Sequence, residues 1–203
     1  ELGDYESAKA DFDQAISMDP KNYDRLIEIY EALAAHGYRE VGQEYLQNVL
    51  DTAKQLDAYD SGRIYYYLGE YQKAYLALDE ARDKGGADSY LYLGRAYAAT
   101  GDYNYASSVY NNYLSKQGPN AEIYNELGLC EMAKKEYQNA LAAFQAGKQI
   151  EGNSLMQTLC FNEIVAYEYL EDYQQAEVLM NAYLQNYPDD QAAIREQQFL
   201  STR

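Results

Sequence analysis

Tryptophan is absent from the 203 residues, and the chain has one histidine, two cysteines and three prolines. A lone His36, with Cys130 and Cys160 far from Cys-x-x-Cys spacing, does not supply the ligands of a zinc site. Two cysteines also fall short of the disulfide framework found in small secreted domains. The composition therefore predicts a fold that needs neither metal nor disulfides.

Positive charge is scarce as well: 16 lysines and arginines face 33 acidic residues, for a net charge of −17. The longest basic run is Lys134-Lys135, so the clusters that contact phosphates are missing and nucleic acid is not an expected partner. No apolar run approaches membrane-spanning length, so we expect no direct membrane insertion. The acidity is typical of a solvated outer surface, although it could also attract a basic or polar partner.

A short segment recurs along the whole chain. Gly-Asp-Tyr-Glu-Ser-Ala at 3–8 returns with variations at 69–74, 101–106, 135–140 and 171–176, and a degenerate copy lies at 37–42. The steps between the small residues that close each copy are 34, 32, 32, 34 and 36 residues. A period of about 34 residues indicates a stacked array of helix–turn–helix units.

Apolar residues repeat at the same period. A large apolar residue follows each closing small residue by four positions; these residues are Phe12, Leu46, Leu78, Tyr110, Phe144 and Met180. A second pattern lies upstream, as Tyr90-x-x-Leu93-Gly94-x-x-Tyr97 and again as Tyr124-x-x-Leu127-Gly128. Spacings of three and four place each set on one face of a helix, so each unit should hold two helices packed against each other.

This combination of positions resembles the tetratricopeptide repeat (TPR) family, whose pattern runs aromatic, Leu-Gly, Tyr, Ala, Phe and Pro. The resemblance implies an all-α fold, a right-handed α-solenoid of tandem helix–turn–helix repeats. Two departures concern buried positions: Glu131 replaces the aromatic residue of a first helix, and Glu163 replaces a leucine in the next unit. The Gly-Asp-Tyr motif itself is interpreted as structural, with the glycine ending one helix and the acidic residue beginning the next.

We expect one continuous solenoid over 1–203, because no linker or shift in composition interrupts the repeats. Its predicted parts are a half-repeat at 1–22, repeats at about 23–54, 55–86, 87–120, 121–154 and 155–190, and a terminal helix at 191–203. Helix starts are expected near Asp4, Asn22, Asp57, Asp88, Asn120 and Ser154. The chain opens without methionine, just before a second helix, so it is expected to be a piece of a longer protein, and its compartment is left open.

The sequence contains no pattern of catalytic residues. His36 lies next to Gly37, where a histidine is typical of a helix end rather than of a catalyst. We therefore expect no enzymatic activity, no cofactor and no metal.

In TPR proteins the first helix of each repeat lines an inner groove, and the resemblance maps one set of positions onto it. The residues expected to bind a peptide there are Tyr59, Arg63, Tyr66, Tyr67, Leu91, Arg95 and Asn125. The same mapping places Asp24, Glu31 and Glu122 on this face. The Lys/Asn clamp by which some TPR domains hold a C-terminal carboxylate is not present at these positions.

Two arginines dominate this predicted surface. Arg63 and Arg95 are 32 residues apart at equivalent positions, so they are expected side by side as an anchor for an acidic peptide group. Alternatively, Arg63 pairs with Asp60 or Asp88 and only balances local acidity.

Two functions follow from this pattern. The first is a non-catalytic scaffold that binds a peptide or helix of a partner protein in the groove. The alternative is a structural module that stacks with the rest of its chain or with another copy, and then the apolar edge with Ile194, Phe199 and Leu200 should be covered. The identity of the partner is not predicted.

Overall fold

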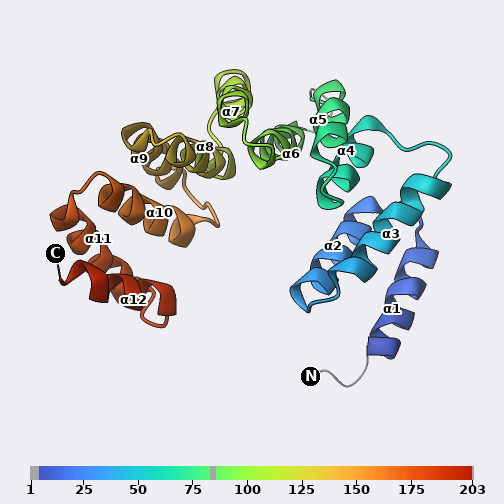
Figure 1. Ribbon diagram of the computed structural model, residues 1–203, viewed down its shortest axis with the longest axis horizontal. Helices are drawn as coiled ribbons and strands as arrows, with labels where there is room; N and C mark the ends of the chain where they lie inside the picture. Colours follow the sequence, from blue (N-terminus) through green and yellow to red (C-terminus); the bar gives the residue numbers. More distant parts are fainter. Residues whose placement is uncertain (1–4, 83–85, 203) are drawn as a thin grey trace. The chain divides into compact units, whose positions relative to one another are not determined.

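The computed structural model describes residues 5–82 and 86–202, and every regular element in these ranges is an α-helix (Figure 1). The helices are α1 (Tyr5–Met18), α2 (Tyr23–Ala35), α3 (Arg39–Thr52), α4 (Ala58–Tyr67), α5 (Tyr71–Glu80), α6 (Gly86–Ala99), α7 (Tyr103–Gln117), α8 (Ala121–Ala133), α9 (Tyr137–Lys148), α10 (Met156–Tyr169), α11 (Tyr173–Asn186) and α12 (Gln191–Leu200). The predicted all-α repeat fold is confirmed.

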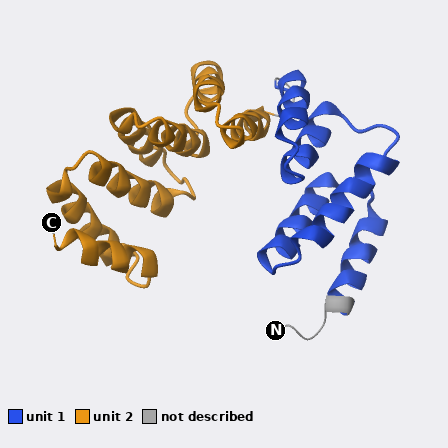
Figure 2. Ribbon diagram, viewed as in Figure 1, with its two compact units in different colours: residues 1–84 blue, residues 85–203 orange. Residues whose placement is uncertain are grey.

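The chain forms two compact units, Glu1–Lys84 and Gly85–Arg203 (Figure 2). The first unit contains α1–α5 and the second contains α6–α12. That the repeats continue as one solenoid from end to end stays a prediction.

Within each unit the helices pair as the repeat predicts. Helix α2 packs against α3 and α4 against α5 in the first unit, while α6 with α7, α8 with α9 and α10 with α11 form the pairs of the second. The repeated large apolar residues hold these pairs together: Leu46, Leu78, Tyr110, Phe144 and Met180 are all fully buried. Their burial explains why one apolar position recurs in every repeat.

Glycines of the first helices lie directly under these side chains. A Cβ atom built on Gly128 would be 2.3 Å from Cε1 of Phe144, and one on Gly94 would be 2.3 Å from Cζ of Tyr110. Such distances are too short for any real contact. The glycine of the Leu-Gly pattern is therefore required because an aromatic ring of the paired helix takes the space of its side chain.

The predicted helix starts are mostly those observed. Asn22, Asp57 and Asn120 each accept a hydrogen bond from a backbone N–H at the start of α2, α4 and α8. Helix α6 begins two residues before Asp88, and α10 begins at Met156, two residues after Ser154. Asp4 lies outside the described residues.

Asn153 explains why α10 begins later than predicted. Its Oδ1 accepts from the Leu155 backbone N–H at 3.1 Å, and its Nδ2 donates to the Ile150 carbonyl at 2.6 Å. The side chain thus holds residues 150–155 in a turn, and the helix begins only after it.

Helix α12 closes the core of the second unit. Ala193 and Leu200 pack with Ile164, Met180 and Tyr183 in one buried cluster. Of the predicted apolar edge of this helix, Leu200 is buried within the unit, Ile194 is half-buried, and Phe199 is 38% exposed.

Candidate peptide-binding surfaces

The predicted binding residues all lie on first helices of repeats. Tyr59, Arg63, Tyr66 and Tyr67 belong to α4, Leu91 and Arg95 to α6, and Asn125 to α8. Helix α2 contacts α4 in the first unit, and α6 contacts α8 in the second. We call the surface made by these first helices the inner face, and describe it separately in each unit.

Arg63 is a buried ion-pair centre of the first unit. Its Nη1 lies 2.5 Å from Oδ1 of Asp24 on α2, and its Nη2 lies 2.7 Å from Oδ1 of Asp60, one turn before it on α4. The guanidinium carbon stands 4.4 Å from the centre of the Tyr59 ring. Arg63 is 7% exposed, so it is fixed by its neighbours rather than extended into solvent.

Burial and charge act in opposite directions in this cluster. Burial alone would lower the pKa of Arg63, but its hydrogen bonds to Asp24 and Asp60 outweigh this effect and raise the pKa. Burial also raises the pKa of Asp60, against the lowering effect of Arg63. Asp60 is one of the two partners proposed from sequence for Arg63, and Asp24 is a partner that the sequence analysis did not propose.

Tyrosines extend this surface along α4. The Tyr67 hydroxyl donates to Oε1 of Glu31 on α2 at 2.6 Å. The Tyr67 ring lies 5.2 Å from that of Tyr30 and 5.3 Å from that of Tyr66, measured between ring centres. These contacts hold the aromatic side chains in place, and a rigid aromatic surface binds a ligand with little loss of side-chain entropy.

Arg95 occupies the equivalent repeat position in the second unit. Its Nη2 lies 2.9 Å from Oε1 of Glu122 and 2.7 Å from Oε1 of Glu126, both on α8, and its Nε donates to Glu126 at 3.0 Å. The Arg95 side chain is 28% exposed, so it is more accessible than Arg63. Both arginines thus contact two carboxylates each, and each cluster carries one net negative charge.

Asn125 and Leu91 have structural contacts of their own. Asn125 is 7% exposed and accepts a hydrogen bond at 2.9 Å from Nδ2 of Asn162 on α10, which links neighbouring first helices. Leu91 is 3% exposed, so most of its side chain belongs to the core. Arg63 and Arg95 lie in different units, so their expected placement in a single patch stays a prediction.

Two carboxyl groups meet at the end of the second unit. Burial and the carboxyl group of Glu196 on α12 raise the pKa of Glu168 on α10 to about 7. The folded state therefore holds a proton on Glu168 at a pH where the unfolded chain has lost it.

We expect the contribution of Glu168 to the free energy of unfolding to fall as the pH rises from about 4.5 to about 7. The unfolded chain loses the Glu168 proton at the lower end of this range, whereas the folded chain loses it only at the upper end. Urea unfolding of the wild type and of Glu168→Gln across this range should give two curves that converge at low pH and separate at high pH, with the variant more stable. Parallel curves would contradict the raised pKa of Glu168. Glu177→Gln, an exposed change on α11, serves as the control.

Three further features of the described residues concern a thiol, metal ligands and membrane crossing. Burial raises the pKa of the Cys130 thiol to about 12, which makes it a poor nucleophile. Among residues 5–82 and 86–202, no three His, Cys, Asp or Glu side chains gather as a metal site would need. No described helix combines the length and apolar character that crossing a bilayer requires.

Comparison with known proteins gives a consistent result. Two tetratricopeptide repeat profiles match the chain, one at residues 59–106 and 93–153 and the other at 1–22, and together they cover more than half of it. No curated protein sequence is similar enough to count as a relative.

Three solved structures illustrate the shared fold. A thermophilic TPR protein of Thermus thermophilus has a TM-score of 0.67 at 16% identity, covering 89% of this chain and 100% of that one. A chain of the APC/C hetero-tetramer Cut9–Hcn1 has a TM-score of 0.65 at 17% identity; 97% of this chain is covered, but only 39% of that one. The second TPR domain of human RPAP3, in complex with an HSP70 peptide, has a TM-score of 0.52 at 17% identity, covering 58% of this chain and 97% of the domain.

The repeated positions, the paired helices and the matching profiles agree. The chain belongs to the tetratricopeptide repeat family.

Proposed function

We propose that this chain is a non-catalytic scaffold whose inner face binds an extended peptide or a helix of a partner protein. Arrays of this family serve as protein-interaction scaffolds, and a related domain has been solved with a bound peptide. The observation that carries the proposal is the pair of arginines at equivalent repeat positions, each held in place by two carboxylates and bordered by tyrosine.

The exposed partner of each arginine suggests how a ligand would bind. The side chains of Asp24 and Glu122 are 76% and 44% exposed, whereas those of Asp60 and Glu126 are 19% and 17% exposed. A carboxylate of an acidic peptide would take the place of Asp24 or Glu122, while the inner partner keeps the guanidinium oriented. Tyr59, Tyr66 and Tyr67 would supply contact area beside Arg63. Leu91 and Asn125 are too deeply buried to add much area beside Arg95, so their part would be to support the face from below.

This exchange predicts opposite effects for two substitutions in the second unit. Arg95→Ala should weaken binding of an acidic peptide by about 1–2 kcal/mol, because a charge-assisted hydrogen bond is lost. Glu122→Gln should strengthen binding, because the competing carboxylate is neutralised. Acidic peptides selected from a random displayed library on the whole chain supply the ligand, and fluorescence anisotropy gives the dissociation constants.

Two controls make this result specific. Glu136→Gln removes an exposed carboxylate that begins α9 and does not contact Arg95, so it reports the general effect of charge. Urea unfolding of each variant shows whether a loss of binding reflects a loss of fold. If Arg95→Ala bound normally, or Glu122→Gln bound more weakly, Arg95 would not be the anchor.

Assembly through the end of the array remains the alternative. Phe199 at the end of α12 is 38% exposed, and Val178 on α11 is 58% exposed, which leaves some apolar surface near the C-terminal helix. Leu200 is already covered within the unit, so this surface is smaller than the sequence suggested. Light scattering that gave the mass of more than one chain, reduced to one by Phe199→Ser, would favour assembly.

A further inference from the structure

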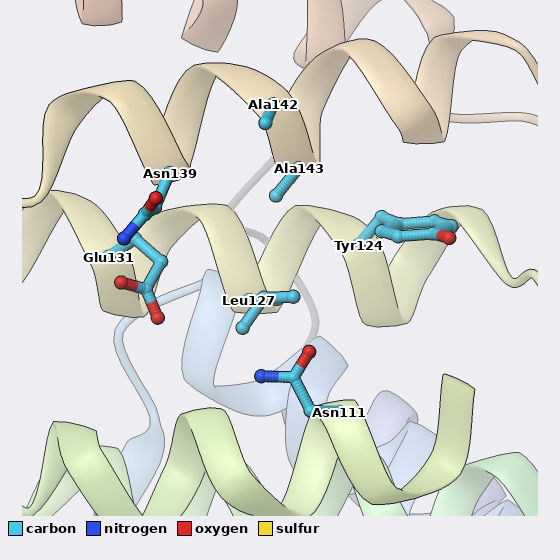
Figure 3. Close-up of a pocket in the computed structure, with 7 residues that line it drawn as sticks. All are labelled: Asn111, Tyr124, Leu127, Glu131, Asn139, Ala142 and Ala143. Atoms are coloured by element: carbon cyan, nitrogen blue, oxygen red, sulfur yellow. The ribbon is translucent and has the colours of Figure 1, made fainter. Parts of the chain in front are cut away.

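A hollow opens between the second helices α7 and α9, away from the inner-face residues described above. It has a volume of about 330 Å³ and is lined by Asn111 of α7, by Tyr124, Leu127 and Glu131 of α8, and by Asn139, Ala142 and Ala143 of α9. Figure 3 shows Glu131 and Asn139 together at one end, Leu127 in the middle and Tyr124 at the other end. The hollow thus has an apolar floor and a polar end.

Glu131 occupies a position where the neighbouring repeats place an aromatic ring. The equivalent residues are Tyr97, 34 residues earlier, and Tyr167, 36 residues later. A glutamate fills less of this space than a tyrosine and brings a carboxylate that is costly to bury. The hollow is therefore the space of a missing ring, and the carboxylate in it needs an explanation beyond stability.

The hydrogen bonds of this carboxylate are one-sided. Glu131 is 6% exposed, and its Oε1 accepts from the Ser107 hydroxyl at 2.8 Å and from the Lys134 ammonium at 2.7 Å. Both bonds end on Oε1, and no residue in the described part of the chain donates to Oε2. Oε2 is left to accept from a ligand, so the hollow contains a buried side chain with an acceptor still available.

The next groove along the unit shows how a cation fits beside such a glutamate. Glu163 of α10 is 5% exposed, and the Lys148 ammonium of α9 donates to its Oε2, while Gln145 donates to Oε1 at 2.9 Å. Here the chain itself supplies the cation and the amide that a buried carboxylate attracts. At Glu131 the chain also supplies a cation, Lys134, but it donates to Oε1, the oxygen that Ser107 also uses. The lining adds the side-chain amides of Asn111 and Asn139.

We propose that this hollow binds an arginine side chain of a partner protein. The apolar part of the arginine would lie over Leu127 and Ala143, and the guanidinium would donate to Oε2 of Glu131 and to the amide oxygen of Asn139. A planar guanidinium can donate to two acceptors at once, which a lysine ammonium does less well. The net charge of −17 favours the approach of a basic segment.

The test selects random displayed peptides on the whole chain and measures the arginine-containing ones by fluorescence anisotropy. Glu131→Gln, which keeps shape and removes charge, should weaken these peptides by about tenfold or more. Glu131→Tyr, which restores the residue type of the neighbouring repeats, should fill the hollow and abolish binding while the chain stays folded. In the wild type the side-chain amide signals of Asn111 and Asn139 should shift on peptide addition.

Two matched variants distinguish binding in this hollow from a general charge effect and from binding at the inner face. Glu136→Gln removes a nearby exposed charge outside the hollow and should leave binding unchanged. Arg95→Ala addresses the inner face, so the two proposals can fail independently. The proposal would be overturned if the selection did not enrich arginine. It would also be overturned if the peptides bound Glu131→Tyr as tightly as the wild type, or if only Arg95→Ala weakened their binding.

Discussion

Replacing Gly128 with alanine should destabilise the chain by about 1–3 kcal/mol, although alanine is the better helix former by about 1 kcal/mol. The added methyl group would stand 2.3 Å from Cε1 and 2.6 Å from Cδ1 of Phe144. Phe144 is fully buried in the cluster with Leu159 and Ala166, so moving its ring would disturb the packing of these neighbours. Urea unfolding followed by circular dichroism measures the loss.

A second substitution tests whether the clash is the cause. Phe144→Leu removes the ring atoms that the new methyl group meets. The double variant Gly128→Ala/Phe144→Leu should therefore lose less unfolding free energy than the two single variants lose together. Gly94→Ala should repeat the result against Tyr110 in the preceding repeat. A Gly128→Ala chain as stable as the wild type would show that these helices pack less closely than described.

Replacing Lys148 with methionine should cost about 3 kcal/mol. The change removes the cation beside Glu163, whose side chain is only 7% exposed, and leaves its charge with Gln145 as the remaining partner. An unpaired buried charge is strongly destabilising, and the 23% exposure of Lys148 places the expected loss at the lower end of the usual range. Urea unfolding again gives the free energy.

The matched double variant should reverse this loss. Lys148→Met/Glu163→Leu places at residue 163 the apolar residue type expected there in the repeat, and apolar replacement of a buried ion pair is often neutral or stabilising. Recovery to wild-type stability or above would show that the pair is not kept for stability. If Lys148→Met alone were neutral, water would already be screening Glu163.

The fold could be predicted because the same constraint recurs in every repeat. Each pair of helices needs a small residue and a large apolar residue at fixed positions, so Ala140 and Phe144 carry the same information as Ala106 and Tyr110. Local turn chemistry was harder to predict. Asn153 delays the start of α10 through bonds to Ile150 and Leu155, and no repeated position indicates this.

The site could be predicted only in part. The resemblance indicated which helices form the inner face, but not that Arg63 would pair with Asp24, a residue 39 positions away on another helix. That contact depends on how two helices are offset along their axes, which no local pattern specifies. The hollow at Glu131 did leave a signal, since the glutamate interrupts an aromatic position, but the sequence alone did not show that space remains beside it.

The two arginine clusters also bear on where repeats can be added to such a chain during evolution. Arg63 forms an ion pair with Asp24 of the preceding repeat, while Arg95 forms ion pairs with Glu122 and Glu126 of the following repeat. Neither set of ion pairs crosses the boundary between the two units. A duplicated repeat inserted at this boundary during evolution would therefore leave both clusters intact, whereas an insertion between α2 and α4, or between α6 and α8, would separate partners that carry opposite charges.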